Sequence, residues 1–95
     1  MSDVPELTQA DFNRSMKRSQ RNRLMKGSPE PGDIVALRRF VGLSQQEFAS
    51  ALGISVHTLR NWEQGRRHPD GPGMALLRIA ARHPKIIREN VASAA

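Results

Sequence analysis

The chain contains no cysteine, so neither disulfides nor a thiolate zinc site can hold it together. It also contains no apolar run near the roughly 20 residues that a membrane span needs, and no signal-peptide pattern opens it. We therefore expect a soluble protein of the cytoplasm that has no membrane partner and whose fold depends on its packed core.

The residue sets that catalysis requires are missing as well. There is no pair of carboxylates in a catalytic arrangement, no nucleophile accompanied by a base, and no glycine-rich phosphate loop. The three histidines, His57, His68 and His83, lack the spacing of metal ligands. We therefore expect no enzyme, no metal and no cofactor.

The chain is rich in positive charge. Fifteen lysines and arginines exceed nine acidic residues, which gives a net charge of +6 over 95 residues. This length predicts one small domain. The charge favours a polyanionic partner such as nucleic acid, although solubility alone would also explain it.

Hydrophobic spacing predicts an all-α protein with five or six helices. Residues 27–32 are rich in proline and glycine and are expected to form a linker. We therefore expect a basic extension with its linker over residues 1–30 and a domain over residues 31–95. The predicted helices lie at residues 8–26 with Thr8 as the cap, at 31–41, at 45–52, at 56–64, from near Pro72, and from Pro84.

Local capping signals define the two middle helices. Ser44 and Glu47 are three residues apart and match a capping box. Gly53 can end the first of these helices, because glycine readily adopts the left-handed conformation common at helix ends. Ser55 can cap the second. Two short helices joined by a tight turn are therefore expected within residues 45–69.

The residues at ten fixed offsets in this stretch resemble the Cro/cI-like (XRE) helix-turn-helix family: Gln45, Ala49, Gly53, Ser55, Thr58, Leu59, Trp62, Glu63, Gly65 and Pro69. The sequence from Trp62 to Pro69, followed by Gly71-Pro72 and Leu76-Leu77, is most similar to HigA- and NadS-type antitoxin regulators. The resemblance covers residues 31–91. It implies a five-helix lambda-repressor-like domain whose second short helix enters the major groove of DNA.

Four outward side chains on that helix are the candidates for contacts with base edges: Val56, His57, Arg60 and Asn61. Asparagine can pair with adenine and arginine with guanine through two hydrogen bonds, and valine can pack on a thymine methyl. Val56 departs from the polar residue that phage repressors often carry here, and His57 could instead contact a phosphate.

Six further residues are candidates for phosphate contacts: Gln45, Ser55, Thr58, Trp62, Arg66 and Arg67. The resemblance places Gln45 on a backbone phosphate, where the helix N-terminus adds partial positive charge. The alternatives are a helix cap for Ser55, a packed side chain for Trp62, and a solvated charge pair for the two arginines. The resemblance also implies an ion pair between Arg38 and Glu63 that joins the first helix of the domain to the recognition helix.

The first 30 residues have an excess of positive charge nearest the linker. Three interpretations stay open for them: an arm that contacts DNA, a segment that folds on a partner protein, and a solvated extension or plain leading helix. The anchors for a partner protein would be apolar side chains, namely Leu7, Phe12, Met16, Leu24 and Met25.

The family resemblance implies an antitoxin. Such a protein would form a homodimer through its last helix, bind a palindromic operator in double-stranded DNA, repress its own operon and neutralise a small HigB- or RelE-like ribonuclease toxin. Two alternatives are a free-standing repressor of the same fold, without a toxin, and a bridging protein whose helix-turn-helix binds other proteins.

Overall fold

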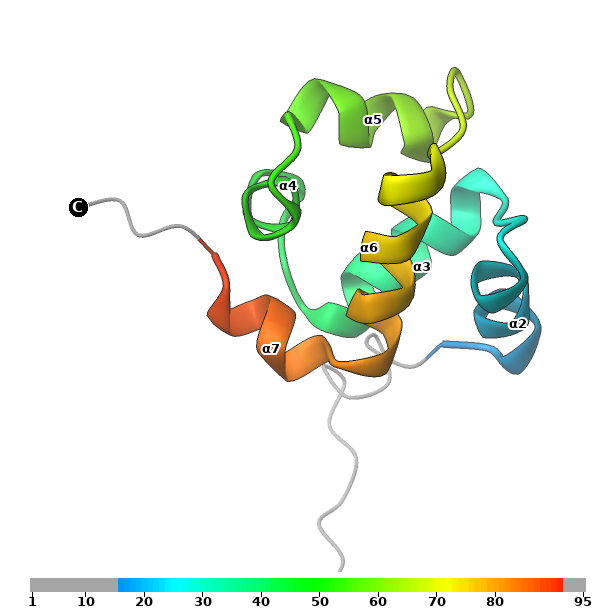
Figure 1. The fold of residues 1–95 in the computed structure, drawn as a ribbon, viewed down its shortest axis with the longest axis horizontal. Helices are drawn as coiled ribbons and strands as arrows, with labels where there is room; N and C mark the ends of the chain where they lie inside the picture. The colour runs from blue at the N-terminus through cyan, green and yellow to red at the C-terminus, as the bar shows by residue number, and fades with distance from the viewer. Residues whose placement is uncertain (1–15, 92–95) are drawn as a thin grey trace, which may run out of the picture.

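The computed structural model describes residues 16–91, in which all regular secondary structure is helical. The helices are α2 (Arg18–Lys26), α3 (Pro31–Val41), α4 (Gln45–Leu52), α5 (Val56–Gln64), α6 (Gly71–Arg82) and α7 (Pro84–Glu89) (Figure 1). This arrangement confirms the predicted all-α fold, with α2 preceding five helices within residues 31–91. Within the described range, no helix is long and apolar enough to cross a membrane.

The turn between α4 and α5 is built from local hydrogen bonds. At the start of α4, the Ser44 hydroxyl accepts from the Glu47 amide at 3.1 Å, and the Glu47 carboxylate accepts from the Ser44 amide at 3.0 Å, so the predicted capping box is confirmed. Gly53, with φ +72°, ends α4 in the left-handed region. The Ser55 hydroxyl then caps α5 by accepting from the Thr58 amide at 3.0 Å.

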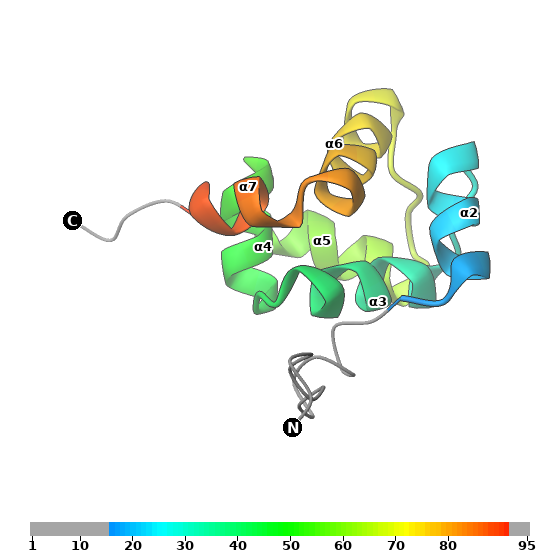
Figure 2. The ribbon, with the colours of Figure 1, turned by 90° about the horizontal axis from the view of Figure 1, so that it is seen from below.

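The core is formed by one apolar face from each helix, and α3 lies at its centre. In Figures 1 and 2, α3 crosses the molecule with α2 at one of its ends and α4 and α7 at the other. Helix α3 packs against α2, α5, α6 and α7, and α4 packs against α5 and α7. The largest fully buried apolar side chains are Phe48, Leu24, Ile34, Leu37, Leu59, Leu77 and Val41.

Helix α2 begins at Arg18, so the prediction of one helix over residues 8–26 is wrong at residues 16 and 17. Lys17 has an extended backbone (φ −68°, ψ 146°), and its amide donates to the Gln20 side-chain oxygen at 3.1 Å. This side-chain acceptor takes the place of a preceding helical carbonyl and starts the helix here. Thr8, the predicted cap, lies outside the described residues.

Contacts to both α3 and α6 hold α2 in place. Leu24 is fully buried in the common core. Arg23 donates to both carboxylate oxygens of Asp33 in α3, at 2.6 and 2.7 Å, and Arg21 donates to the Ala81 carbonyl of α6 at 2.9 Å. This part of the basic extension therefore packs on the helices that follow it, and a domain boundary at residue 30 stays a prediction.

A close approach of α6 to α5 requires glycine at position 73. A β-carbon there would lie 2.9 Å from the Trp62 ring and 2.9 Å from the Asp70 carboxylate that caps α6. We therefore expect Gly73→Ala to lower the free energy of unfolding by about 1–3 kcal/mol. Gly71→Ala in the same helix is the control, because a β-carbon at that position would meet nothing within 4 Å. Denaturant unfolding followed by Trp62 fluorescence tests this, and equal midpoints for the two variants would contradict it.

Candidate nucleic-acid interface

Helix α5 lies at the rim of the molecule (Figure 1), and its exposed residues are polar. Leu59 and Trp62 bury its inner face. His57, Arg60 and Gln64 are exposed, and Asn61 is half-buried beside them. A polar helix face of this size, supported from behind by a packed core, is suited to entering a DNA major groove.

Val56 differs from the other base-edge candidates in packing against the hydrophobic core. Its side chain is half-buried and packs against the core, so it has less surface to offer a thymine methyl than a fully exposed valine. Gln64 was not among the candidates, although it is exposed and lies seven residues after His57. Because residues seven apart share one face of a helix, this spacing could have identified it.

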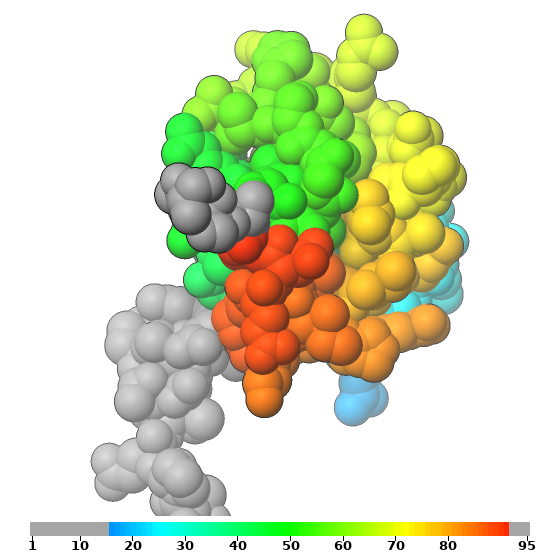
Figure 3. Space-filling view, turned by 60° about the vertical axis from the view of Figure 1, so that its left-hand side comes forward, coloured from blue at the N-terminus to red at the C-terminus, as the bar shows by residue number. Residues whose placement is uncertain are grey.

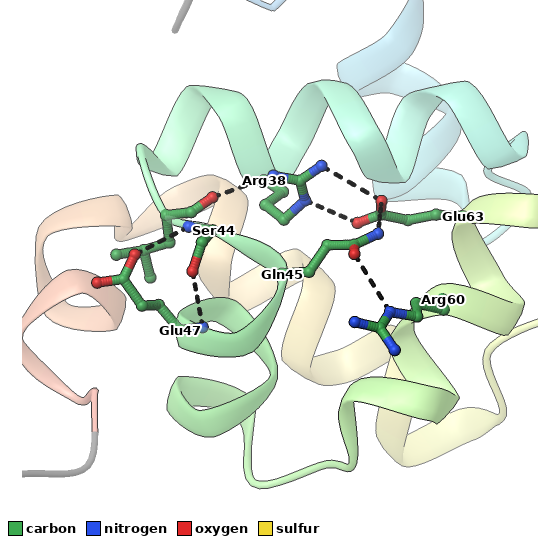
Figure 4. A network of polar contacts seen from close by, with 7 residues as sticks. Arg38, Ser44, Gln45, Glu47, Arg60 and Glu63 are labelled. Atoms are coloured by element: carbon green, nitrogen blue, oxygen red, sulfur yellow. Dashed lines mark hydrogen bonds and ion pairs between the residues drawn. The ribbon is translucent and has the colours of Figure 1, made fainter. Parts of the chain in front are cut away.

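A chain of polar side chains connects α3, α4 and α5 (Figure 4). Arg38 donates to Glu63 through Nε at 2.8 Å and through a terminal nitrogen at 3.4 Å. The Gln45 amide nitrogen donates to the same carboxylate at 3.0 Å, and Arg60 donates to the Gln45 amide oxygen at 3.3 Å. We call these four residues the Glu63 network.

The Glu63 network braces the helix-turn-helix from inside. The Glu63 side chain is only 5% exposed and that of Arg38 17%. Both charges are therefore largely removed from water, and each is stabilised by the opposite charge of its partner. Arg38 also donates to the Leu43 carbonyl at 3.2 Å, just before α4 begins. The pair named by the family resemblance is therefore present as an ion pair that fixes α4 and α5 relative to α3.

The candidates for phosphate contact fall into two environments. Gln45 is half-buried in the Glu63 network, Ser55 and Thr58 share a 2.9 Å hydrogen bond at the α5 cap, and Trp62 is 5% exposed and packed. Arg66 and Arg67 are exposed in the loop after α5. The amides of both arginines donate to the Asn61 carbonyl, at 3.0 and 3.4 Å, which sets the path of this loop.

The candidates for partner contact also differ in exposure. Leu7 and Phe12 lie outside the described residues. Leu24 has no exposed surface, so the interpretation of this side chain as an anchor for a partner does not fit the folded α2. Met16 and Met25 are half-buried against the core and keep some exposed area. An apolar stripe in the sequence could not distinguish these cases, since it has the same pattern whether it faces the chain's own core or a partner.

The electrostatics of the interface are cationic. Arg60, Arg66 and Arg67 are exposed along α5 and the loop after it, whereas Glu63 is already paired with Arg38. Such a surface attracts a phosphate backbone. Across residues 16–91, no three His, Cys, Asp or Glu side chains come together as ligands for a metal ion.

Comparison with known proteins agrees with this geometry. Antitoxin HigA-2 of Vibrio cholerae is 42% identical over 57 residues, which are 60% of this chain and 55% of that protein. The HTH-type transcriptional regulator YiaG of Escherichia coli K12, described as uncharacterized, is 32% identical over 57 residues, 60% of this chain and 59% of its own length. Antitoxin MqsA of the same strain is 30% identical over 59 residues, 62% of this chain and 45% of that protein.

The chain spans about half the length of these relatives, so each match covers only part of the relative. A family model covers much more of the chain. The model described as the antitoxin component of bacterial toxin-antitoxin system, MqsA, matches residues 5–91. The predicted resemblance to helix-turn-helix antitoxin regulators is thereby confirmed. The chain belongs to the MqsA family of antitoxin components.

Proposed function

We propose that this protein is a sequence-specific DNA-binding antitoxin that represses its own toxin–antitoxin operon. The observation that carries the proposal is the polar, cationic face of α5, which the Glu63 network holds rigidly on α3. Helix α5 enters the major groove with His57 and Asn61 toward the bases. Gln45, the α5 cap and the arginines after α5 contact the phosphates on either side.

We expect the protein to bind a palindromic operator as a homodimer that pairs through α7. Ile86 in α7 is 57% exposed and Ile79 in α6 is 45% exposed, and these are the large exposed apolar side chains in the described range. In Figure 3, the surface of α7 lies next to that of α4, whereas α5 lies beyond α4 at the far end of the visible face. A second copy at α7 therefore leaves α5 open to DNA, with two recognition helices about 34 Å apart, one turn of the duplex.

The protein partner is a small ribonuclease toxin of the HigB or RelE kind, bound in the cytoplasm. Support comes from family membership and from the name of the HigA-2 relative. Of the anchors named from the sequence, Met16 and Met25 keep exposed area within the described residues. Toxin binding is therefore assigned to the N-terminal part of the chain, on the side of α2.

Two substitutions separate positioning contacts from base contacts. Arg66→Ala should weaken binding to all duplexes about equally and lower the slope of log affinity against log salt by about one, because it removes one phosphate contact. Asn61→Ala should relax the preference at one base pair, at a cost of about 1–3 kcal/mol for the preferred duplex. Titrations against matched and mismatched duplexes measure both effects. Unchanged sequence preference in Asn61→Ala would contradict the base-contact assignment.

The direct test of the proposed function is capture of the tagged protein from its native cells, with bound protein and bound DNA both identified. A small ribonuclease at equal stoichiometry, together with the promoter of a shared operon, supports an autorepressing antitoxin. Promoter DNA without a protein indicates a free-standing repressor. A protein without specific DNA indicates a bridging protein and contradicts the proposal.

A further inference from the structure

The Gln45 side chain has a defined orientation that controls Arg60. The Glu63 carboxylate can only accept hydrogen bonds, so the Gln45 amide must turn its nitrogen toward it, at 3.0 Å. Its oxygen then faces away from Glu63 and accepts from Arg60 Nε at 3.3 Å. A buried carboxylate thus orients the Gln45 amide, whose oxygen accepts from an exposed guanidinium on α5.

Arg60 and Asn61 are adjacent in sequence but occupy different sides of α5. Successive side chains of an α-helix are separated by about 100° around its axis. Arg60 is three residues before Glu63 and shares its side of the helix, which faces α4. Figure 4 shows the Arg60 guanidinium next to Gln45, at the start of α4. Asn61 leaves α5 on the side away from Glu63.

We propose that Arg60 is a phosphate ligand and not a base-reading residue, and that it forms with Gln45 a two-residue clamp for a single DNA phosphate. This proposal rests on the proposed function as a DNA-binding protein. It moves Arg60 out of the set of base contacts and leaves base selection to His57 and Asn61. Gln45 is then a positioning residue for Arg60 as well as a phosphate ligand.

The donors left free by the network fit an anionic oxygen. Gln45 Nε2 has a second N–H beyond the one given to Glu63, and the terminal nitrogens of Arg60 are not used by its bond to Gln45. Arg38 already balances Glu63, so Arg60 adds positive charge at this edge. Reading guanine would instead require the Arg60 side chain, held at Nε by Gln45, to extend its terminal nitrogens to the groove floor.

The test is selection of preferred duplexes from a random-sequence DNA library with the full chain and its variants. Arg60→Ala should select the same sequence as the wild type. It should bind that sequence about tenfold more weakly, with a salt slope lower by about one. Gln45→Ala should behave alike. The double variant should lose little more than either single one, because the two residues hold the same phosphate. Asn61→Ala is the control and should select a relaxed sequence.

Three outcomes overturn the clamp. Arg60→Ala could lose preference at one base pair with an unchanged salt slope, which would make Arg60 a base reader. The fold losses of DNA affinity in the two single variants could multiply in the double variant, which would show that Arg60 and Gln45 contact DNA independently. The wild type could select no sequence and bind no duplex, and then the proposed function fails together with the clamp. Unfolding midpoints of all variants show that folded protein is compared in each case.

Discussion

Glu63→Ala is expected to lower the free energy of unfolding by about 3 kcal/mol and to weaken DNA binding more than loss of any one exposed arginine does. The substitution leaves the Arg38 guanidinium, 17% exposed, without its carboxylate and removes the acceptor of the Gln45 amide. Removing one partner of a buried pair typically costs about 3–5 kcal/mol. The low end applies here because Arg38 keeps the Leu43 carbonyl as an acceptor.

Denaturant unfolding followed by Trp62 fluorescence measures the stability effect, since Trp62 packs one residue before Glu63. Glu89→Ala is the matched control. It removes an exposed carboxylate from the end of α7 and should change stability by less than about 0.5 kcal/mol. If the two variants unfold at the same denaturant concentration, Glu63 does not brace the helix-turn-helix.

A double substitution separates the contribution of the Arg38–Glu63 pair to folding stability from its role in positioning Gln45 and Arg60. Replacing a buried ion pair by apolar residues of similar volume is often neutral or stabilising. Arg38→Met combined with Glu63→Leu should therefore recover most of the lost stability. DNA binding should stay weak in this variant, because no carboxylate orients Gln45 and Arg60. Recovery of both stability and DNA affinity would show that the Glu63 network serves packing alone.

Asp33→Ala is expected to release α2 from the core at a cost of about 2–3 kcal/mol. Asp33 is 1% exposed and accepts two hydrogen bonds from Arg23, at 2.6 and 2.7 Å, and one from the Glu30 amide at 2.8 Å. Losing the carboxylate leaves these donors without an acceptor at the joint between α2 and α3. Native-state hydrogen exchange should show α2 amides losing protection while those of α4 keep theirs. Equal loss in α2 and α4 would mean that α2 does not detach separately.

The same pair predicts how α2 docking depends on pH. The hydrogen bonds from Arg23 are the main reason that the pKa of Asp33 lies below its ordinary value, and the Glu30 amide lowers this pKa further. Because the pKa is lower in the folded state, the stabilisation is complete above the unfolded carboxyl pKa of about 3.9. It is lost as the pH falls through the folded value. Wild-type α2 should therefore stay docked at neutral pH and loosen only in acid, whereas Asp33→Asn should lack this acid transition.

The bounds of α3, α4 and α5 could be predicted because their signals are local. Ser44 and Glu47 are three residues apart, and the left-handed position at Gly53 directly follows α4. Such contacts form within one helical turn and need no information about the rest of the fold. The fixed offsets of the motif likewise place His57 and Asn61 on one helix.

Tertiary packing decided where the remaining side chains belong. Leu24 lies in the core, and the orientation of Gln45 depends on Glu63, 18 residues further along the chain. Arg21 reaches a carbonyl 60 residues away. Sequence by itself determined the bounds of α3, α4 and α5, the caps of α4 and α5 and the helix-turn-helix, since these depend on near neighbours. Only the packing of the helices decided which apolar stripe lies in the core and which arginine side chains form hydrogen bonds. These contacts join residues that are distant along the chain.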